Sequence, residues 1–286
     1  MQAGSLAWPP GSTPMAPCSS NATLDSCASS TARSRYDERD VTILALDCGY
    51  SRLAWGLADA RGWVAQGAVA NQEIGTLALR DWQNMPRPAR VVGVNVAGEA
   101  TRVRVEAQLT RWRTMPQWLI ATEEACGVRN RYALPSQLGG DRWASLIAAR
   151  QRLAQELFQP ACVVVNARTA ITVDAMDAGG EFRGGAILPG VNLMLQALAA
   201  NTALKIPPGR YYDFPLSNAD AMLSGAIQAI CGAIEQMRLR LDIGAALPKC
   251  FVAGGAAPDI APHLTDPVEV VDNLVLEGVL TLATEQ

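Results

Sequence analysis

Hydrophobic and polar positions along the chain form the same pattern twice, in stretches about 120 residues apart. In each copy an apolar run, 41–46 or 162–165, ends in a polar residue, Asp47 or Asn166. A turn of small residues that contains a hydroxyl group follows, and then a second strand that ends in an Asp-Ala turn. Such a repeat predicts an internal duplication, in which two strand–turn–strand units bring two polar turns together.

The first copy continues as a meander, because three apolar runs are joined by short turns that contain Asp and Gly. These runs are 41–47, 52–59 and 63–70. The polar interval 71–89 is expected to be helical. Buried strands at 90–98 and 117–122, with a helix from Glu99 to Trp112 between them, predict a parallel crossover.

A loop of unusual composition, 126–142, leads into a helix whose apolar positions run from Trp143 to Leu157. Asp141 and Arg142 therefore fall at the N-terminus of a helix, where two interpretations stay open. Asp141 is either an N-cap with a solvated arginine beside it, or the pair faces the two polar turns at the positive end of the helix dipole.

Further helices are expected after Gly190 and after a capping box at 217–220. The second of these carries an apolar stripe from Ile227 to Leu241 at alternating spacings of three and four. That stripe is typical of a helix that faces the core, and equally of a seam between two subunits. The chain is then expected to close with strands at 250–255 and 268–271 and a helix from Leu274.

Residues 1–40 are rich in Ser, Ala, Pro and Gly and show no apolar periodicity, which predicts a disordered tail. They lack the basic and apolar regions of a signal peptide. Two α/β domains are expected after the tail, an N-terminal one at 41–158 and a C-terminal one at 159–286.

The composition excludes several classes of function. The formal net charge of the 286 residues is −3, which argues against a surface for nucleic acid. Seven scattered cysteines without a C-x-x-C pair and a single histidine predict a reduced, cytoplasmic environment and no zinc site. Catalysis by a histidine-activated nucleophile is disfavoured, since His263 is expected in an exposed loop. No apolar run is long enough to span a membrane.

The two polar turns are suited to binding anions, because small residues let backbone N–H groups approach a phosphate and the hydroxyl group adds a donor. Either turn by itself is more often simply a turn. The repetition favours the functional interpretation, in which a pair of turns holds the phosphates of a nucleotide from two sides.

The loop residues narrow this interpretation to one family. The block Gly139-Gly140-Asp141-Arg142-Trp143, together with Tyr132, Gly184-Gly185, Leu188-Pro189-Gly190 and Asn201-Thr202-Ala203, resembles the type III pantothenate kinases, which include the Bvg accessory factor. The resemblance covers about residues 41–283. It implies an α/β fold of duplicated actin-like ATPase (ribonuclease H-like) domains with an interdomain cleft.

The resemblance also implies a reaction, in which ATP phosphorylates pantothenate in the first step of coenzyme A biosynthesis. Asp141 would be the base, and the substrate pocket would contain Tyr132, Gly139, Gly140, Arg142 and Thr202. ATP and Mg²⁺ would be bound by Asp47, Gly49, Ser51, Arg52, Thr169, Gly254 and Gly255. Asn166 stands where many members hold a monovalent cation, K⁺ or NH₄⁺. The resemblance further implies a homodimer, in which Thr202 reaches the partner's pantothenate. The Ile227–Leu241 stripe, from its spacing, is our candidate for the seam.

Both turns differ from the family pattern at Tyr50, Asn166 and Arg168, where the family has Asn, Asp and Gly. Two hypotheses follow. The chain is an active kinase in which Arg168 lies aside or supplies charge to the phosphates, or it is a catalytically impaired kinase-fold protein that acts as a binding or regulatory partner. From the sequence we expect Arg168 to compete with the nucleotide, so that Arg168→Gly raises ATP affinity about tenfold.

Overall fold

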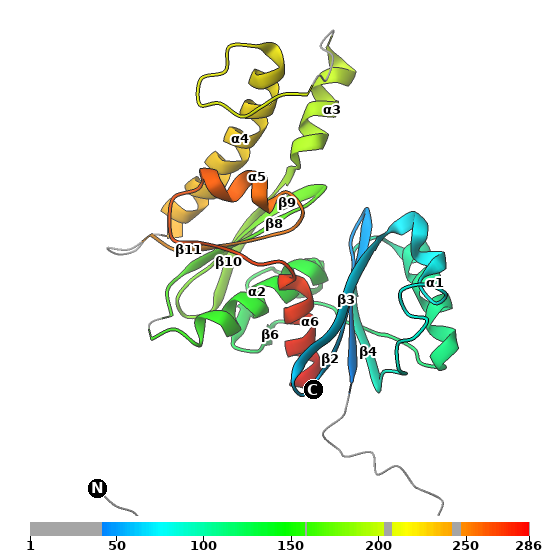
Figure 1. Cartoon of the computed structure of the whole chain (residues 1–286). Coiled ribbons are helices and arrows are strands. Elements are labelled where there is room, and N and C mark those ends of the chain that lie inside the picture. The colour runs from blue at the N-terminus through cyan, green and yellow to red at the C-terminus, as the bar shows by residue number, and fades with distance from the viewer. Residues whose placement is uncertain (1–41, 158, 203–207, 242–246, 286) are drawn as a thin grey trace, which may run out of the picture. The chain divides into compact units, whose positions relative to one another are not determined.

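The computed structural model describes residues 42–157, 159–202, 208–241 and 247–285. The tail predicted for residues 1–40 lies outside the described residues. Two β-sheets organise the described chain, one of five strands and one of seven (Figure 1).

The five-stranded sheet has the order β3-β2-β1-β4-β5. Strands β1 (Ile43–Cys48), β2 (Arg52–Asp59) and β3 (Gly62–Ala70) form the predicted antiparallel meander. Strand β4 (Arg90–Asn95) pairs in parallel with β1, and helix α1 (Glu99–Leu109) connects it to β5 (Gln117–Trp118). The predicted parallel crossover is therefore confirmed.

Two expectations in this half are wrong in detail. The strand expected at 117–122 is only two residues long and is not fully buried, because β5 is the edge of its sheet and pairs only with β4. The interval 71–89 contains a short 3₁₀ helix, Asn71–Thr76, followed by turns. Ile74, Leu77 and Trp82 anchor these turns in the core, so that packing, rather than a continuous helix, holds the segment.

The seven-stranded sheet has the order β12-β11-β8-β9-β10-β7-β6. Its central strands β8 (Cys162–Ala167), β9 (Ala170–Met176) and β10 (Glu181–Pro189) repeat the antiparallel meander of the first sheet. Strand β11 (Lys249–Ala253) lies parallel to β8, as β4 lies parallel to β1. The duplication predicted from the hydrophobic pattern is therefore present in the topology.

The edge strands of the second sheet come from segments before and after its central strands. Strand β12 (Val268–Val270) pairs with β11, while β6 (Glu124–Ala125) and β7 (Val128–Asn130) extend the sheet beyond β10. The two latter strands precede residue 158, so the second sheet recruits residues from before the predicted domain boundary. The division at residue 158 itself stays a prediction.

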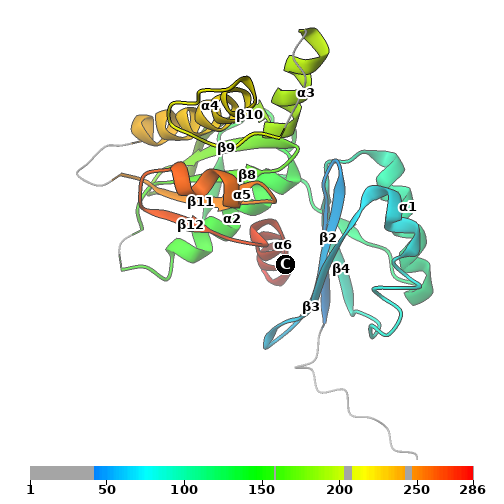
Figure 2. The same cartoon turned by 45° about the horizontal axis from the view of Figure 1, so that its top comes forward.

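Helices α2 (Gly140–Leu153) and α6 (Leu274–Thr284) pack against each other. A Cβ atom on Gly278 of α6 would lie 1.8 Å from the carbonyl oxygen of Ala144, so the close crossing requires glycine there. Helix α6 also contacts β1 and β4, through a buried cluster that includes Ile43, Val92 and Val279. The end of the chain thus packs against the first sheet (Figures 1 and 2).

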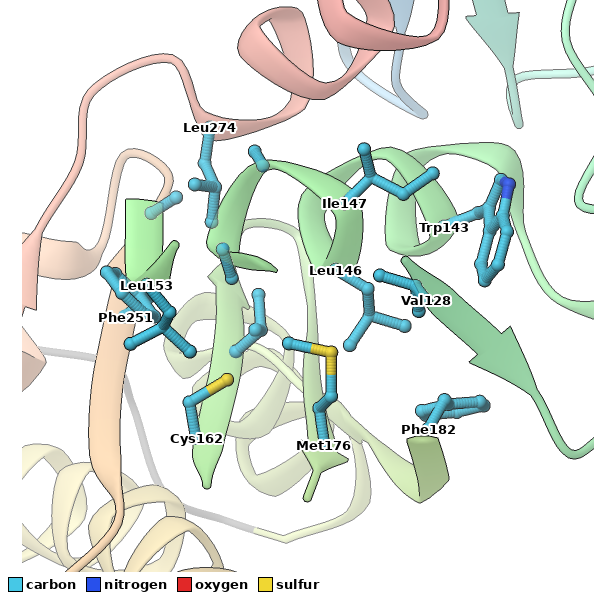
Figure 3. Packing of buried hydrophobic residues seen from close by; sticks show 14 of the residues in the cluster. Val128, Trp143, Leu146, Ile147, Leu153, Cys162, Met176, Phe182, Phe251 and Leu274 are labelled. Atoms are coloured by element: carbon cyan, nitrogen blue, oxygen red, sulfur yellow. The ribbon is translucent and has the colours of Figure 1, made fainter. Parts of the chain in front are cut away.

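The inner face of α2 fills the core beside the second sheet (Figure 3). Trp143, Leu146 and Ile147 are fully buried against strand residues such as Met176 and Phe182. The helix ends at Leu153, and Leu157, which the spacing placed on its apolar face, is 92% exposed.

Helix α4 (Asn218–Leu241) covers the other face of the second sheet. It buries Ile227, Ile230, Ile234 and Leu241 against that face. The stripe is therefore core, and its proposed use as a subunit seam is wrong because the sheet already covers it. Helix α3 (Val191–Asn201), in contrast, has no fully buried residue. The shortest helices are α5 (Ala257–Ile260) and three 3₁₀ turns at Thr110–Trp112, Pro135–Gln137 and Ala261–His263.

The single histidine, the cysteines, the metal-ligating side chains and the helices can be compared with the sequence expectations. His263 is exposed, with its ring stacked on Tyr211 at a centroid distance of 3.7 Å. The five cysteines in the described ranges are free thiols, while Cys18 and Cys27 lie outside them. Those ranges contain no group of three or more His, Cys, Asp or Glu side chains that could hold a metal ion. None of the helices in the described part of the chain combines the length and the apolar character that crossing a bilayer requires.

Candidate active site

The two polar turns lie against each other, as the repeat predicted. The hydroxyl oxygens of Ser51, in the β1–β2 turn, and Thr169, in the β8–β9 turn, are 3.0 Å apart. The first turn is held by Asn71, whose side-chain amide donates to the carbonyl oxygens of Gly49 and Tyr50, at 2.9 Å each. Sequence reasoning missed Asn71, because a polar residue just after a strand carries no signal of where it folds back.

An ion pair joins the same two turns. The Arg168 guanidinium donates through Nη2 to Oδ2 of Asp47 at 2.5 Å. The Asp47 side chain is 1% exposed, and its other oxygen, Oδ1, has no hydrogen-bond partner among the described residues. The charge that the sequence suggested would obstruct the phosphates is therefore held by the carboxylate of the opposite turn.

The backbone accepts Arg168 without strain. The only residues other than glycine with positive φ in the described ranges are Arg113 and Cys126, so Arg168 does not adopt the left-handed conformation that would strain a side chain. The arginine stem passes beside Gly254, where a Cβ would lie 3.0 Å from its Cγ. Gly254 has φ +103° and abuts the carbonyl oxygen of Ala167, which places it, with Gly255 after it, next to the second turn.

Asp141 lies in the first turn of α2, but it is not the N-cap. Gly139 occupies that position, and Oδ1 of Asp141 accepts a hydrogen bond from the backbone N–H of Arg142 at 2.8 Å. Burial, followed by the nearby charge of Asp47, raises the pKa of Asp141, while Arg168 acts in the opposite direction. The alternative of a plain N-cap beside a solvated arginine is therefore wrong on both counts, since Arg142 is 5% exposed.

The partner of Arg142 is Asp174, a residue that sequence reasoning missed. Nε of Arg142 donates to both oxygens of Asp174 at 3.1 Å, and Nη2 donates to Oδ1 at 2.5 Å. The remaining nitrogen, Nη1, donates to the hydroxyl oxygen of Tyr132 at 3.1 Å. The available signal was an aspartate inside the apolar strand 170–176, because a buried carboxylate needs a cationic or hydrogen-bonding partner.

Two glycines make room for this arrangement. A Cβ on Gly185 would lie 2.1 Å from Oδ1 of Asp174 and 2.7 Å from Nη2 of Arg142. A Cβ on Gly139 would lie 2.7 Å from Oδ1 of Asp141. The structure thus brings Tyr132, Gly139, Asp141 and Arg142 together, as predicted.

Asn166 is buried at the end of β8, and its amide is already bonded. Its oxygen accepts from the Ser145 hydroxyl at 3.1 Å, and its nitrogen donates to the Thr172 hydroxyl at 3.4 Å. Gly140, the first residue of α2, lies against Val94 of β4. A Cβ on Gly140 would lie 3.0 Å from Cγ1 of Val94.

The other predicted site residues lie further out. Arg52 is exposed, and its carbonyl oxygen accepts from the N–H of Gly49 at 3.0 Å, which closes the first turn. Thr202 follows the last residue of α3, where its hydroxyl donates to the carbonyl oxygen of Leu198 at 2.6 Å.

One cavity of about 440 Å³ lies apart from these residues, around the turn between β9 and β10. Its lining includes Glu124, Arg129 and Asp177 but none of the predicted site residues. We therefore locate the candidate site from the residues of the turns and of α2, and not from this cavity.

Comparisons with known proteins identify the family of the chain. The family model for type III pantothenate kinase matches residues 43–240. The type III pantothenate kinase of Nitrosospira multiformis is 44% identical over 246 residues, which are 85% of this chain and 91% of that protein. The type III pantothenate kinase of Aromatoleum aromaticum is 46% identical over 246 residues, covering 85% and 98% of the two chains.

Solved structures show the same fold at low sequence identity. A crystal structure from Campylobacter jejuni, assigned to the Baf family of transcriptional activators, matches with a TM-score of 0.56 at 18% identity, covering 85% of this chain and 98% of that one. A Sinorhizobium meliloti protein described as a 2-dehydro-3-deoxygalactonokinase matches with a TM-score of 0.54 at 12% identity, covering 85% and 96%. These likenesses place the two sheets in the actin-like ATPase fold.

Proposed function

The chain belongs to the type III pantothenate kinase family, and on that premise we propose that its two turns and the start of α2 transfer a phosphoryl group from ATP to the hydroxyl group of pantothenate. This reaction is the first step of coenzyme A biosynthesis. The observation that carries the assignment of roles is Asp141, a partly buried carboxylate that senses the charges of Asp47 and Arg168 in the two turns and accepts a hydrogen bond from the backbone N–H of Arg142.

Asp141 acts as the base that accepts the proton of the pantothenate hydroxyl group. Burial and the charge of Asp47 raise its pKa, which strengthens it as a proton acceptor at neutral pH. Phosphoryl transfer relies mainly on positioning and on charge stabilisation, so a single carboxylate is sufficient for the proton transfer.

The two turns hold the phosphates of ATP. Ser51 and Thr169 offer hydroxyl groups at a separation of 3.0 Å, and Gly49 and Gly254 bring no side chain into the crowded space beside the turns. Asp47 fits a magnesium site, because its Oδ1 is buried without a partner in the described chain, and Mg²⁺ commonly takes one or two carboxylates together with substrate phosphates. When bound, Mg²⁺ supplies charge that screens the phosphate oxygens.

Arg142 and Tyr132 bind the pantothenate carboxylate. Asp174 accepts hydrogen bonds from Nε and Nη2 of Arg142. Nη1 and the Tyr132 hydroxyl group therefore present the polar surface to the substrate, with Gly139 and Gly140 beside it. Because the charge of Asp174 balances that of Arg142, recognition of the pantothenate carboxylate depends more on the direction of these hydrogen-bond donors than on net charge.

A monovalent cation does not fit Asn166. The amide is neutral, its oxygen accepts from Ser145, and its nitrogen is directed to Thr172. We derive no step through K⁺ or NH₄⁺ at this position.

We propose that the chain works as a homodimer in the cytoplasm, with a different face from the one the sequence suggested. Helix α3 is apolar yet has no fully buried residue, and Phe214 and Leu216 in the segment before α4 are 88% and 99% exposed. A second copy would cover these groups and bring Thr202, at the end of α3, towards the partner's substrate. Light scattering of the parent and of a Phe214→Ser/Leu216→Ser variant tests this, since a monomeric parent would contradict it.

The experiment that tests the assigned chemistry is Asp141→Asn. The substitution preserves shape and removes the base, so turnover with pantothenate is expected to fall roughly 10²–10⁴-fold. A coupled assay with and without pantothenate measures this, and Arg183→Gln, at an exposed arginine of β10, is the control. An unchanged kcat would remove Asp141 from the mechanism, and a parent without turnover would favour the alternative of an impaired binding or regulatory protein.

A further inference from the structure

The Arg168 side chain lies beside both polar turns and Gly254. Its side chain starts in the second turn, runs past Gly254, and ends over the first turn, where a Cβ on Gly49 would lie 3.3 Å from its Nη1. Its Nη2 reaches Asp47, 121 positions away in the sequence. The guanidinium is thus already located where phosphate oxygens are bound in the proposed function.

The charges around Arg168 favour keeping it protonated. Burial opposes the charged form, but Asp47 and then Asp141 outweigh it and raise the pKa of Arg168. One cation therefore stands near two carboxylates, the buried Asp47 and the partly buried Asp141. The trio carries a net charge of −1, so a further cation still finds an attractive site here.

The ion pair is built so that it can be exchanged. A single nitrogen contacts a single oxygen, the arginine side chain is 31% exposed, and the backbone at Arg168 has no unfavourable φ. The other oxygen of Asp47 is free of partners among the described residues. Asp47 can therefore turn to a metal ion while Arg168 remains within reach of the same space.

We propose that Arg168 is a further catalytic residue, whose guanidinium exchanges Asp47 for the phosphate oxygens of the donor nucleotide once Asp47 turns to Mg²⁺. An arginine in this role stabilises the charge that spreads over the transferred phosphoryl group. The exchange breaks one ion pair and forms another, with no covalent step. The inference rests on the proposed function, because it assumes that the two turns bind the phosphates.

Nucleotide binding provides the first test, and it does not depend on turnover. The parent, Arg168→Gln, Arg168→Lys and the control Arg183→Gln are titrated calorimetrically with a non-hydrolysable ATP analogue and with ADP, in the presence of Mg²⁺. In Arg168→Gln the ratio of the affinity for the ATP analogue to the affinity for ADP is expected to fall roughly tenfold or more, because in the proposal the guanidinium contacts the terminal phosphate. Arg168→Lys should keep part of this preference for the ATP analogue, and Arg183→Gln all of it.

Turnover provides the second test. We expect kcat to fall roughly 10–100-fold in Arg168→Gly, and added guanidinium chloride at millimolar concentration to restore part of it. Tighter or equal binding of the triphosphate in Arg168→Gln, with kcat undiminished in Arg168→Gly, would overturn the proposal and support the obstruction expected from the sequence. If the parent fails to phosphorylate pantothenate, the proposed function fails, but the titrations still decide the role of Arg168.

Discussion

Two arginine–aspartate pairs lie close to the same site, and they are built differently. Arg142 and Asp174 are 6% and 0% exposed, and three hydrogen bonds from two nitrogens hold them together as a locked pair where α2 packs on the second sheet. Arg168 and Asp47 share one contact, the arginine is about one third exposed, and the partners come from different sheets.

The difference separates positioning from exchange. A pair with several buried hydrogen bonds fixes the orientation of the guanidinium, so Arg142 can direct its one remaining nitrogen at a substrate. A pair with a single, partly exposed contact keeps the two charges close but fixes their orientation only weakly. Such a contact can break when either group meets a stronger partner. The following predictions test that contrast, from the largest expected effect to the smallest.

Breaking the locked pair is expected to have the largest effect. Asp174→Ala leaves the buried Arg142 guanidinium without its partner, at a cost of about 3–5 kcal/mol in the free energy of unfolding. Urea denaturation of the variant and parent measures this. The double variant Arg142→Met/Asp174→Leu should recover much of the loss, and a loss below about 1 kcal/mol in Asp174→Ala would show that the pair is solvated.

Crowding the locked pair should have a smaller effect. Gly185→Ala adds a Cβ 2.1 Å from the Asp174 carboxylate, and we expect a loss of about 1–3 kcal/mol from overpacking. Gly225→Ala is the matched control, because it adds the same methyl group to an open position of α4, where alanine is expected to be neutral or slightly stabilising. Equal effects of the two substitutions would contradict the tight fit around Asp174.

Breaking the exchangeable pair should cost less, and a metal ion should compensate for it. Arg168→Gln is expected to lose about 1–2 kcal/mol, because Asp47 stays buried with fewer partners. Millimolar Mg²⁺ should raise the Tm of this variant more than that of the parent, since Asp47 no longer has to leave Arg168. Thermal unfolding with and without Mg²⁺ measures this, and an equal rise in both proteins would argue against a metal site at Asp47.

The smallest expected effect on stability concerns Asp141, and it has the opposite sign. Its folded-state pKa is raised, so its contribution to stability is full below the unfolded-state pKa of about 3.9 and is lost as the pH rises through the folded-state value. Asp141→Asn removes that loss and should raise the Tm at neutral pH by roughly 1–4 °C, although it abolishes turnover. A Tm that falls in this variant would contradict the assignment.

The same carboxylate gives a pH signature that links it to Arg168. Turnover should fall as the pH drops through the pKa of Asp141, which burial and Asp47 raise from its ordinary value. Arg168 acts against this rise, so Arg168→Gln should move the acidic limb of kcat/KM to higher pH, whereas Arg183→Gln should not. A limb at the same pH in all three proteins would separate Arg168 from the base.

By itself, the sequence determined the duplicated meanders, the two hydroxyl-bearing turns and the helix that begins at Asp141 and Arg142. These features follow from local periodicity and turn chemistry, which neighbouring residues specify. Only the tertiary structure decided which polar groups meet. It pairs Arg168 with Asp47 and Arg142 with Asp174, and it brings the Asn71 amide to the first turn. It also decided that the α4 stripe faces its own sheet and not a second subunit. The physical reason is that a long polar side chain can bond to several partners, and an apolar helix face can be covered by several surfaces, equally well. The choice depends on what the fold brings within a few ångströms, and that information is not local in the chain.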